Sequence, residues 1–234
     1  MGLFPGAKKY FREKSGAFLT GGMAGMPRPA VIVTDMMLLL YMFDAYRERA
    51  RAAGRTHVTG TLRCLAGFLW ERIAHPDGAT HLERWQTHVV TFDISGCTPR
   101  AKEATQAKRR DGVAVYEGST ASSAFEADAE LPTPLSSVLR AAGGTRGLVD
   151  AMLPLFETMY GSSVSTQAEI VIQAGGGPFV LRKTGLRVWT ERLLHVAHLE
   201  DVGEGDLSVC FWVQVGTGGY APREPPLPQF SQPV

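Results

Sequence analysis

The chain has 234 residues, a hydrophobic fraction of 44% and a formal net charge of +1. This composition is ordinary for one sizeable globular domain, and it excludes a chain that is disordered throughout. A net charge so close to zero also excludes attraction of the whole molecule to nucleic acid, so any such attraction must come from local basic patches.

The cysteines and the apolar runs limit where the protein works. Cys64, Cys97 and Cys210 are widely spaced and odd in number, which fits neither a disulfide framework nor a CxxC metal site. The apolar run at 36–41 is far shorter than the ~20 residues that a membrane span requires. We therefore expect a soluble cytoplasmic or nuclear protein with no membrane partner.

The chain opens its folded part with a strand pattern followed by two helix patterns. Residues 30–33 form a continuous apolar run of β-branched type, which predicts a strand buried on both faces, and Asp35 follows it. A helix is predicted over 36–53, with Gly54 ending it, and another over 60–74, where apolar residues recur at helical spacing.

The next strand again leads to an acid. Residues 89–92 have the strand pattern, and Asp93 follows. Thr98 and Pro99 are a favourable N-cap and first helical residue, so a helix is predicted over 99–110. The order strand, helix, helix, strand, helix indicates an α/β fold with a central, mostly parallel sheet flanked by helices.

The second half is less regular. We expect a folded domain over 1–215, interrupted by a loop or mobile insertion at about 111–135 that is rich in Gly, Ser and acids. Five prolines in the last 15 residues predict a disordered tail over 216–234. Within the domain, further elements are predicted as a helix at 148–160, a strand at 169–173, a turn at 175–178 and a strand at 196–199.

Four carboxylates follow apolar strand patterns: Asp35, Asp93, Glu204 and Asp206. The C-terminal ends of parallel strands meet at one edge of a sheet, where ligands bind. Carboxylates gathered there repel each other unless cations neutralise them, and oxygen ligands select Mg²⁺ or Mn²⁺. The pattern predicts metal-assisted phosphodiester hydrolysis. For Asp35 alone, an N-cap of the following helix explains the residue equally well.

The predicted helix after Pro99 has a cationic face, because its polar residues recur at i, i+4, i+7 and i+8. These residues are Lys102, Gln106, Arg109 and Arg110. Arg donates paired hydrogen bonds to phosphate oxygens and Lys adds a point charge, so the face suits a terminal phosphate. On charge alone, a solvated helix surface explains the same residues.

The same residues carry a resemblance to a family. The run 99–110, with its Lys, Gln, Arg and Arg, resembles the signature of the XRN 5′-to-3′ exoribonucleases, in which this spacing forms the pocket for a 5′ monophosphate. The strand ends at Asp35 and Asp93 and the segment 202–206 resemble further blocks of that family in the same order. The wider PIN and flap-endonuclease class shares this layout of sheet and acids.

The resemblance implies roles for nine residues. The 5′ phosphate would be held by Lys102, Gln106, Arg109 and Arg110. Metal would be bound by the catalytic acids Asp35, Asp93, Glu204 and Asp206. Tyr41 stands where the family has a His that stacks on the terminal base, and a Tyr ring can stack too. A packed helix residue explains Tyr41 equally well.

The sequence also departs from the family. The loop between Asp93 and Pro99 is two residues longer, and 112–194 matches poorly. The family's Asp-x-Asp block and a later Asp are missing, since Glu224 is the only acid after Asp206. The fold is thus expected to be incomplete on its C-terminal side.

Three functions stay open. The first is a 5′-to-3′ exoribonuclease that acts on single-stranded RNA with a 5′ monophosphate, with the missing acids supplied by a partner chain or by divergent residues. The second is a catalytically inactive relative that binds RNA 5′ ends. The third is an interaction module that keeps only the fold.

Overall fold

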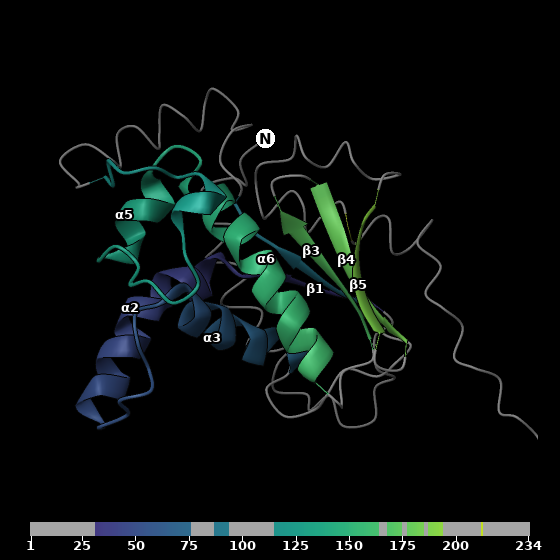
Figure 1. The fold of residues 1–234 in the computed structure, drawn as a ribbon, viewed down its shortest axis with the longest axis horizontal. Coiled ribbons are helices and arrows are strands. Elements are labelled where there is room, and N and C mark those ends of the chain that lie inside the picture. Colours follow the sequence, from purple (N-terminus) through teal and green to yellow (C-terminus); the bar gives the residue numbers. More distant parts are fainter. Residues whose placement is uncertain are drawn as a thin grey trace, which may run out of the picture.

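The computed structural model describes residues 31–75, 87–93, 115–163, 168–174, 177–184, 187–193 and 212. Within them, five strands form one sheet and helices pack beside it (Figure 1). The strands are β1 (Val31–Asp35), β2 (Thr87–Thr91), β3 (Glu169–Ala174), β4 (Gly177–Thr184) and β5 (Arg187–Arg192). The helices are α2 (Met37–Ala52), α3 (Leu62–Ala74), α5 (Leu135–Arg140) and α6 (Gly144–Ser162), with a short 3-10 helix, η1 (Ser122–Ala124).

The strands lie side by side in chain order, from β1 to β5. β1, β2 and β3 are parallel, whereas β4 runs antiparallel to β3 and β5 runs antiparallel to β4. The predicted α/β class is therefore confirmed in its coarse form, and the described strands form a mixed sheet in which β1, β2 and β3 supply the parallel part. Only two residues separate β3 from β4, and only two separate β4 from β5. A connection this short can join only antiparallel strands.

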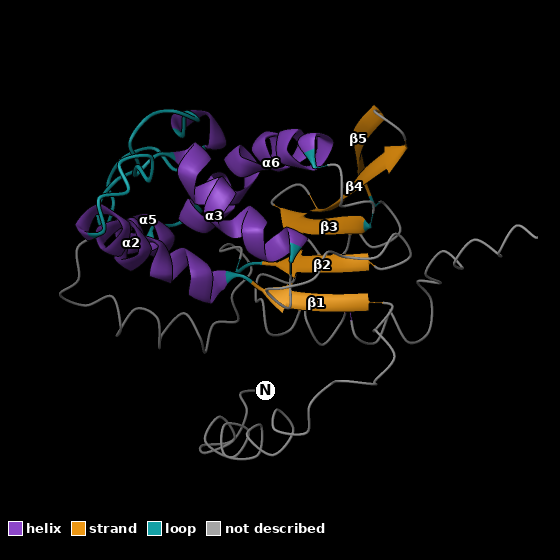
Figure 2. Cartoon of the chain, turned by 90° about the horizontal axis from the view of Figure 1, so that it is seen from below, coloured by secondary structure: helices purple, strands orange, loops and turns teal. Residues whose placement is uncertain are grey.

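The helices gather on one side of the strands, as Figure 2 shows. α6 packs against β3, β4 and β5, and it also contacts α3 and α5. The sheet face turned toward the helices carries Val90, Ile170, Ile172 and Leu181, which belong to one buried cluster with apolar residues of the helices. Burial of this cluster is the main stabilising contribution to the helical layer.

The other face of the sheet has a smaller buried cluster. Val89, Val171 and Val180 pack there with Leu193 and Trp212. Trp212 is only 1% exposed, so a residue from the C-terminal part of the chain covers this face. β2 is buried on both faces in consequence, whereas Val31 to Thr34 of β1 are only half-buried. The predicted burial of the first strand on both faces is therefore confirmed only in part: Ile32 packs against the larger cluster and Val31 and Val33 against the smaller one, but all three are half-buried.

The helix boundaries follow local signals. α2 ends at Ala52, and Gly54 then adopts a positive φ of 72°, a conformation that favours glycine. The Thr61 hydroxyl caps α3 by accepting a hydrogen bond from the Cys64 amide at 3.3 Å. α6 begins earlier and ends later than predicted. Lys183 of β4 contacts its C-terminal end, with Nζ 3.0 Å from the Gly161 carbonyl oxygen and 2.8 Å from that of Ser163.

Several predicted segments lie outside the described residues. These are the basic helix at 99–110, the strand at 196–199 and the tail at 216–234. Of the predicted insertion, residues 115–134 are described, and they form irregular chain with the single short helix η1.

Candidate functional site

Asp35 and Asp93 lie at the same edge of the sheet. β1 and β2 are parallel neighbours, and Asp35 is paired in register with Thr91, the last residue of β2. The Met36 amide continues this pairing past the strand by donating to the Thr91 carbonyl oxygen at 3.0 Å. Asp93 follows Thr91 by two residues. Asp35 is the last residue of β1 and Asp93 comes just after β2, so both acids lie at the C-terminal ends of neighbouring parallel strands, as the sequence predicted.

Backbone dimensions limit the separation of the two acids. Adjacent strands lie ~4.8 Å apart and two residues of chain span at most ~7 Å, so the Cα atoms of Asp35 and Asp93 are at most roughly 12 Å apart. The Asp35 side chain is exposed and that of Asp93 is half-buried. Both are thus in reach of a ligand that approaches this edge of the sheet.

One oxygen of Asp35 is engaged in helix capping. Its Oδ1 accepts a hydrogen bond at 2.9 Å from the backbone amide of Met37, the first residue of α2. This bond satisfies an amide that has no partner within the helix, and the negative charge lies at the positive end of the helix dipole. The N-cap residue of α2 is Met36, so Asp35 stands one residue before the N-cap position, although it still bonds the first helical amide. Metal binding would have to share the carboxylate with this bond.

The described residues supply only part of the predicted metal site. Among them, no group of three or more His, Cys, Asp or Glu side chains is arranged to hold a metal ion. Hard oxygen donors are present in Asp35 and Asp93, which fits Mg²⁺ or Mn²⁺ in donor type but not in number. The other predicted ligands, Glu204 and Asp206, lie outside the described residues. The same holds for the predicted phosphate-binding residues Lys102, Gln106, Arg109 and Arg110.

Tyr41 lies on the solvent side of α2. Its side chain is 47% exposed, and it forms an apolar stripe on this helix with Leu38 and Met42, which are also exposed. The alternative of a packed helix residue therefore does not describe Tyr41. Tyr41 lies at most two helical turns from Met36. It is therefore near the N-terminal end of α2, which starts at the edge of the sheet that carries Asp35 and Asp93.

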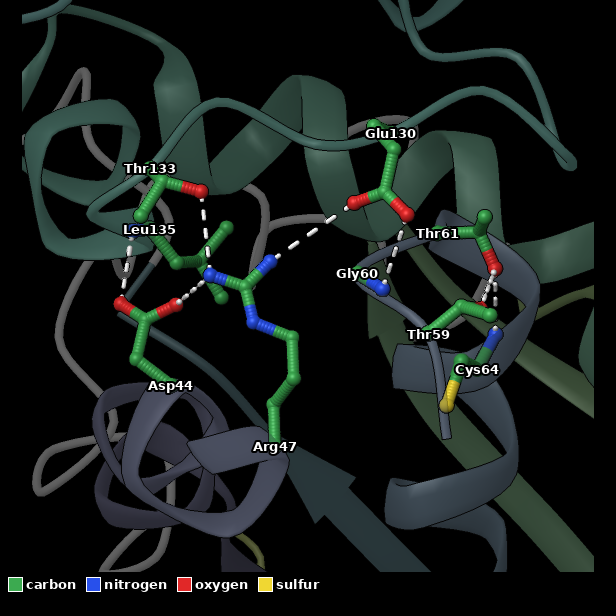
Figure 3. Close-up of polar contacts among 9 residues, drawn as sticks. All are labelled: Asp44, Arg47, Thr59, Gly60, Thr61, Cys64, Glu130, Thr133 and Leu135. Carbon is green, nitrogen blue, oxygen red and sulfur yellow. Dashed lines mark hydrogen bonds and ion pairs between the residues drawn. The ribbon is translucent and has the colours of Figure 1, made fainter. Parts of the chain in front are cut away.

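A second polar cluster, not predicted from the sequence, joins α2 to the chain before α5 (Figure 3). Arg47 is 9% exposed and donates from one guanidinium nitrogen to Asp44 Oδ1 at 3.3 Å and to Thr133 Oγ1 at 3.0 Å. Its other terminal nitrogen is 3.7 Å from Glu130 Oε2. Asp44 Oδ2 accepts from the Leu135 amide at 2.8 Å, so it caps α5. The i, i+3 spacing of Asp44 and Arg47 was the available signal in the sequence.

The irregular segment 115–134 is also attached to α3. Arg63 donates to Asp128 through two nitrogens, at 2.6 and 2.9 Å, and this contact lowers the pKa of the Asp128 carboxyl. The Arg63 amide donates to the Ala127 carbonyl oxygen at 2.8 Å, and Phe125 is buried in the main core. The segment therefore packs as part of the domain over its described residues.

A hollow of about 710 Å³ lies between α2 and α3. Its apolar wall includes Leu39, Tyr46 and Phe68, and its polar rim includes His57, Glu71, Arg72 and His75. The hollow does not include Asp35 or Asp93. Its position was not predicted, because a helix pattern in sequence does not show which side chains face a gap between two helices.

His88 is fully buried on β2, away from the edge with Asp35 and Asp93 and outside the lining of the hollow. Its Nε2 is 2.9 Å from Thr34 Oγ1, and its Nδ1 is 2.8 Å from the Ile73 carbonyl oxygen at the end of α3. Burial lowers the pKa of His88 to about 4, because the charged imidazolium loses its hydration there. The ring is therefore neutral near pH 7 and joins β1, β2 and α3.

Comparisons of the chain with protein-family models, with curated proteins and with solved structures found no match. Within the described part of the chain, no helix has the length and apolar character needed to cross a membrane.

Proposed function

We propose that this chain is a metal-dependent 5′-to-3′ exoribonuclease of XRN and PIN-like type, acting on single-stranded RNA with a 5′ monophosphate. In this proposal Asp35 and Asp93 bind Mg²⁺ or Mn²⁺ with Glu204 and Asp206. A bound metal would activate water and stabilise the leaving oxygen. The 5′ phosphate is held by Lys102, Gln106, Arg109 and Arg110.

One observation carries the proposal more than any other. Asp35 and Asp93 come from segments far apart in sequence and follow neighbouring parallel strands at their C-terminal ends. This is the edge at which open α/β sheets bind ligands. The half-exposed Tyr41 on α2 supports the proposal, because an accessible ring is what base stacking requires.

A second candidate function is binding of RNA 5′ ends without hydrolysis. Two observations favour it: the described carboxylates form no group of three, and Asp35 already accepts a hydrogen bond from the Met37 amide. A two-metal site needs ligands for both ions, and each 1.36 kcal/mol lost from transition-state stabilisation is about tenfold in rate. Hydrolysis would then be slow or absent while end binding remains.

The test is incubation of the pure protein with Mn²⁺ and end-labelled single-stranded RNA carrying either a 5′ phosphate or a 5′ hydroxyl. The exonuclease releases mononucleotides from the 5′-phosphate RNA only. Binding of 5′-phosphate ends that weakens with salt, with no products, supports the second function. If the protein cleaves neither RNA and binds both ends with equal affinity, both proposals are refuted and only the interaction module remains.

Asp35→Asn and Asp93→Asn test the metal role within this assay. Asn keeps an oxygen that accepts from the Met37 amide but removes the charge that a metal requires. Glu48→Gln is the matched control, because Glu48 is an exposed carboxylate on α2 away from the acid edge. Cleavage should be lost in both Asn variants and kept in the control. Cleavage by Asp35→Asn at the original rate would exclude Asp35 as a ligand.

A further inference from the structure

The hollow between α2 and α3 has the dimensions of a small-molecule site. Its volume of about 710 Å³ falls in the range of roughly 300–1,000 Å³ that is usual for ligand pockets. Leu39 and Tyr46 of α2 form one wall, and residues of α3 from Cys64 to Arg72 form the other. Such sites combine apolar walls with a few polar groups, and this hollow has both.

Aromatic rings form the apolar surface. The ring centroids of Tyr46 and Phe68 are 4.5 Å apart with an interplanar angle of 31°, and Phe43 lies behind Phe68 at 5.8 Å. The buried Phe43 supports the other two rings from the core, which fixes their orientation. A planar aromatic group laid against Tyr46 and Phe68 would add a further ring to this cluster at favourable spacing.

The rim offers mainly hydrogen-bond donors. Arg72, in the last turn of α3, is exposed and makes no ion pair among the described residues. His57 and His75 add two imidazoles. Glu71 is the one carboxylate among the described lining residues, and its Oε2 lies 3.9 Å from His75 Nδ1. The rim therefore complements an anionic group better than a cationic one.

From this arrangement we infer that the hollow between α2 and α3 binds a small planar aromatic anion, with its ring against Tyr46 and Phe68 and its anionic group at Arg72. The inference is independent of the proposed nuclease site, since neither Asp35 nor Asp93 lines the hollow. It assigns the protein a second, small-molecule site.

The test uses 1-anilinonaphthalene-8-sulfonate, a fluorescent aromatic sulfonate, titrated against the full chain. Arg72→Gln should raise the Kd about tenfold, because a hydrogen bond to a charged group is lost. Arg51→Gln is the matched control: Arg51 is an exposed arginine in the last turn of α2 that does not line the hollow. Asp35→Asn should bind the probe as the original chain does, which separates this site from the proposed nuclease.

Cys64 supplies a second measurement within the hollow. Its thiol is half-buried in the wall, so a bound ring should slow its alkylation by iodoacetamide, followed on the Cys64 peptide by mass spectrometry. The site is supported if the probe slows alkylation of Cys64 in the original chain and in Arg51→Gln but gives little protection in Arg72→Gln. The inference is overturned if Arg72→Gln and Arg51→Gln bind the probe equally, or if the probe does not protect Cys64.

Discussion

The hydroxyl of Thr34 and the imidazole of His88 meet across the parallel pair β1 and β2, with Oγ1 and Nε2 2.9 Å apart. The other ring nitrogen lies 2.8 Å from the Ile73 carbonyl oxygen, so three elements share one buried side chain. A protonated ring would carry two donors and no acceptor, and its charge would have no hydration.

His88 should therefore make the protein less stable as pH falls. The pKa of the group is 6.5 in an ordinary environment and about 4 in the fold, so the unfolded chain takes up the proton first. The contribution to stability is complete above pH 6.5 and is lost as pH falls toward 4, to a total of about 3 kcal/mol. The free energy of unfolding from urea titrations between pH 7 and 4 measures it. His88→Leu should show a shallower decline over this interval; an equally steep decline would assign the effect to other groups.

Arg47 should contribute more to stability than any exposed arginine of α2. Arg47→Met leaves Asp44 and Glu130 without their cation and removes the bond to Thr133, so we expect a loss of roughly 2–4 kcal/mol in the free energy of unfolding. Arg49→Met, on the exposed side of the same helix, should change it by less than about 0.5 kcal/mol. Urea unfolding of both variants gives the comparison, and equal effects would contradict the anchoring role of Arg47.

Two glycines inside helices should respond to alanine with opposite sign. A Cβ on Gly147 of α6 would lie 1.7 Å from the Thr120 carbonyl oxygen, so Gly147→Ala must displace backbone and should cost roughly 1–3 kcal/mol. A Cβ on Gly67 of α3 meets only Met159 Cε, at 3.9 Å, so Gly67→Ala should stabilise the protein by about 0.5–1 kcal/mol. Thermal unfolding of the two variants is a direct test. A stabilised Gly147→Ala would mean that α6 and residue 120 are not in contact.

The capping role of Asp35 can be separated from any role in metal binding by stability measurements without metal. Asp35→Ala removes the acceptor of the Met37 amide and should cost about 1 kcal/mol, whereas Asp35→Asn should cost only a few tenths. The melting temperatures of both variants in the presence of a chelator check this. If the two variants melt together, the bond to Met37 contributes no stability in solution.

The elements that the sequence predicted well are those with a strong local pattern. The β-branched run at 30–33 and the apolar spacing at 60–74 correspond to β1 and α3, because each pattern buries one defined set of side chains. The prediction missed the β4–β5 hairpin. The Gly-rich cluster at 175–178 was interpreted as a turn alone, whereas Gly177 and Pro178 already belong to β4 and pair with β3.

The candidate site was predictable only where chain order determines position. Parallel pairing of two strands that are consecutive in sequence places Asp35 and Asp93 at one edge, and the strand patterns were sufficient for that inference. The Arg47 cluster and the hollow at Tyr46 and Phe68 depend on how α2, α3 and residues 115–134 pack in three dimensions. The sequence pattern alone does not show that Thr133, 86 positions further along the chain, accepts a hydrogen bond from Arg47.

The late position of Trp212 in the chain has a consequence during synthesis. The valines of β2, β3 and β4 and Leu193 are all made earlier, so the described part of this apolar cluster lacks its largest side chain until the tryptophan has emerged. Such a surface is a binding site for chaperones and a starting point for aggregation. Chains cut short before this residue should therefore accumulate in the insoluble fraction, even though every strand of the described sheet is already present.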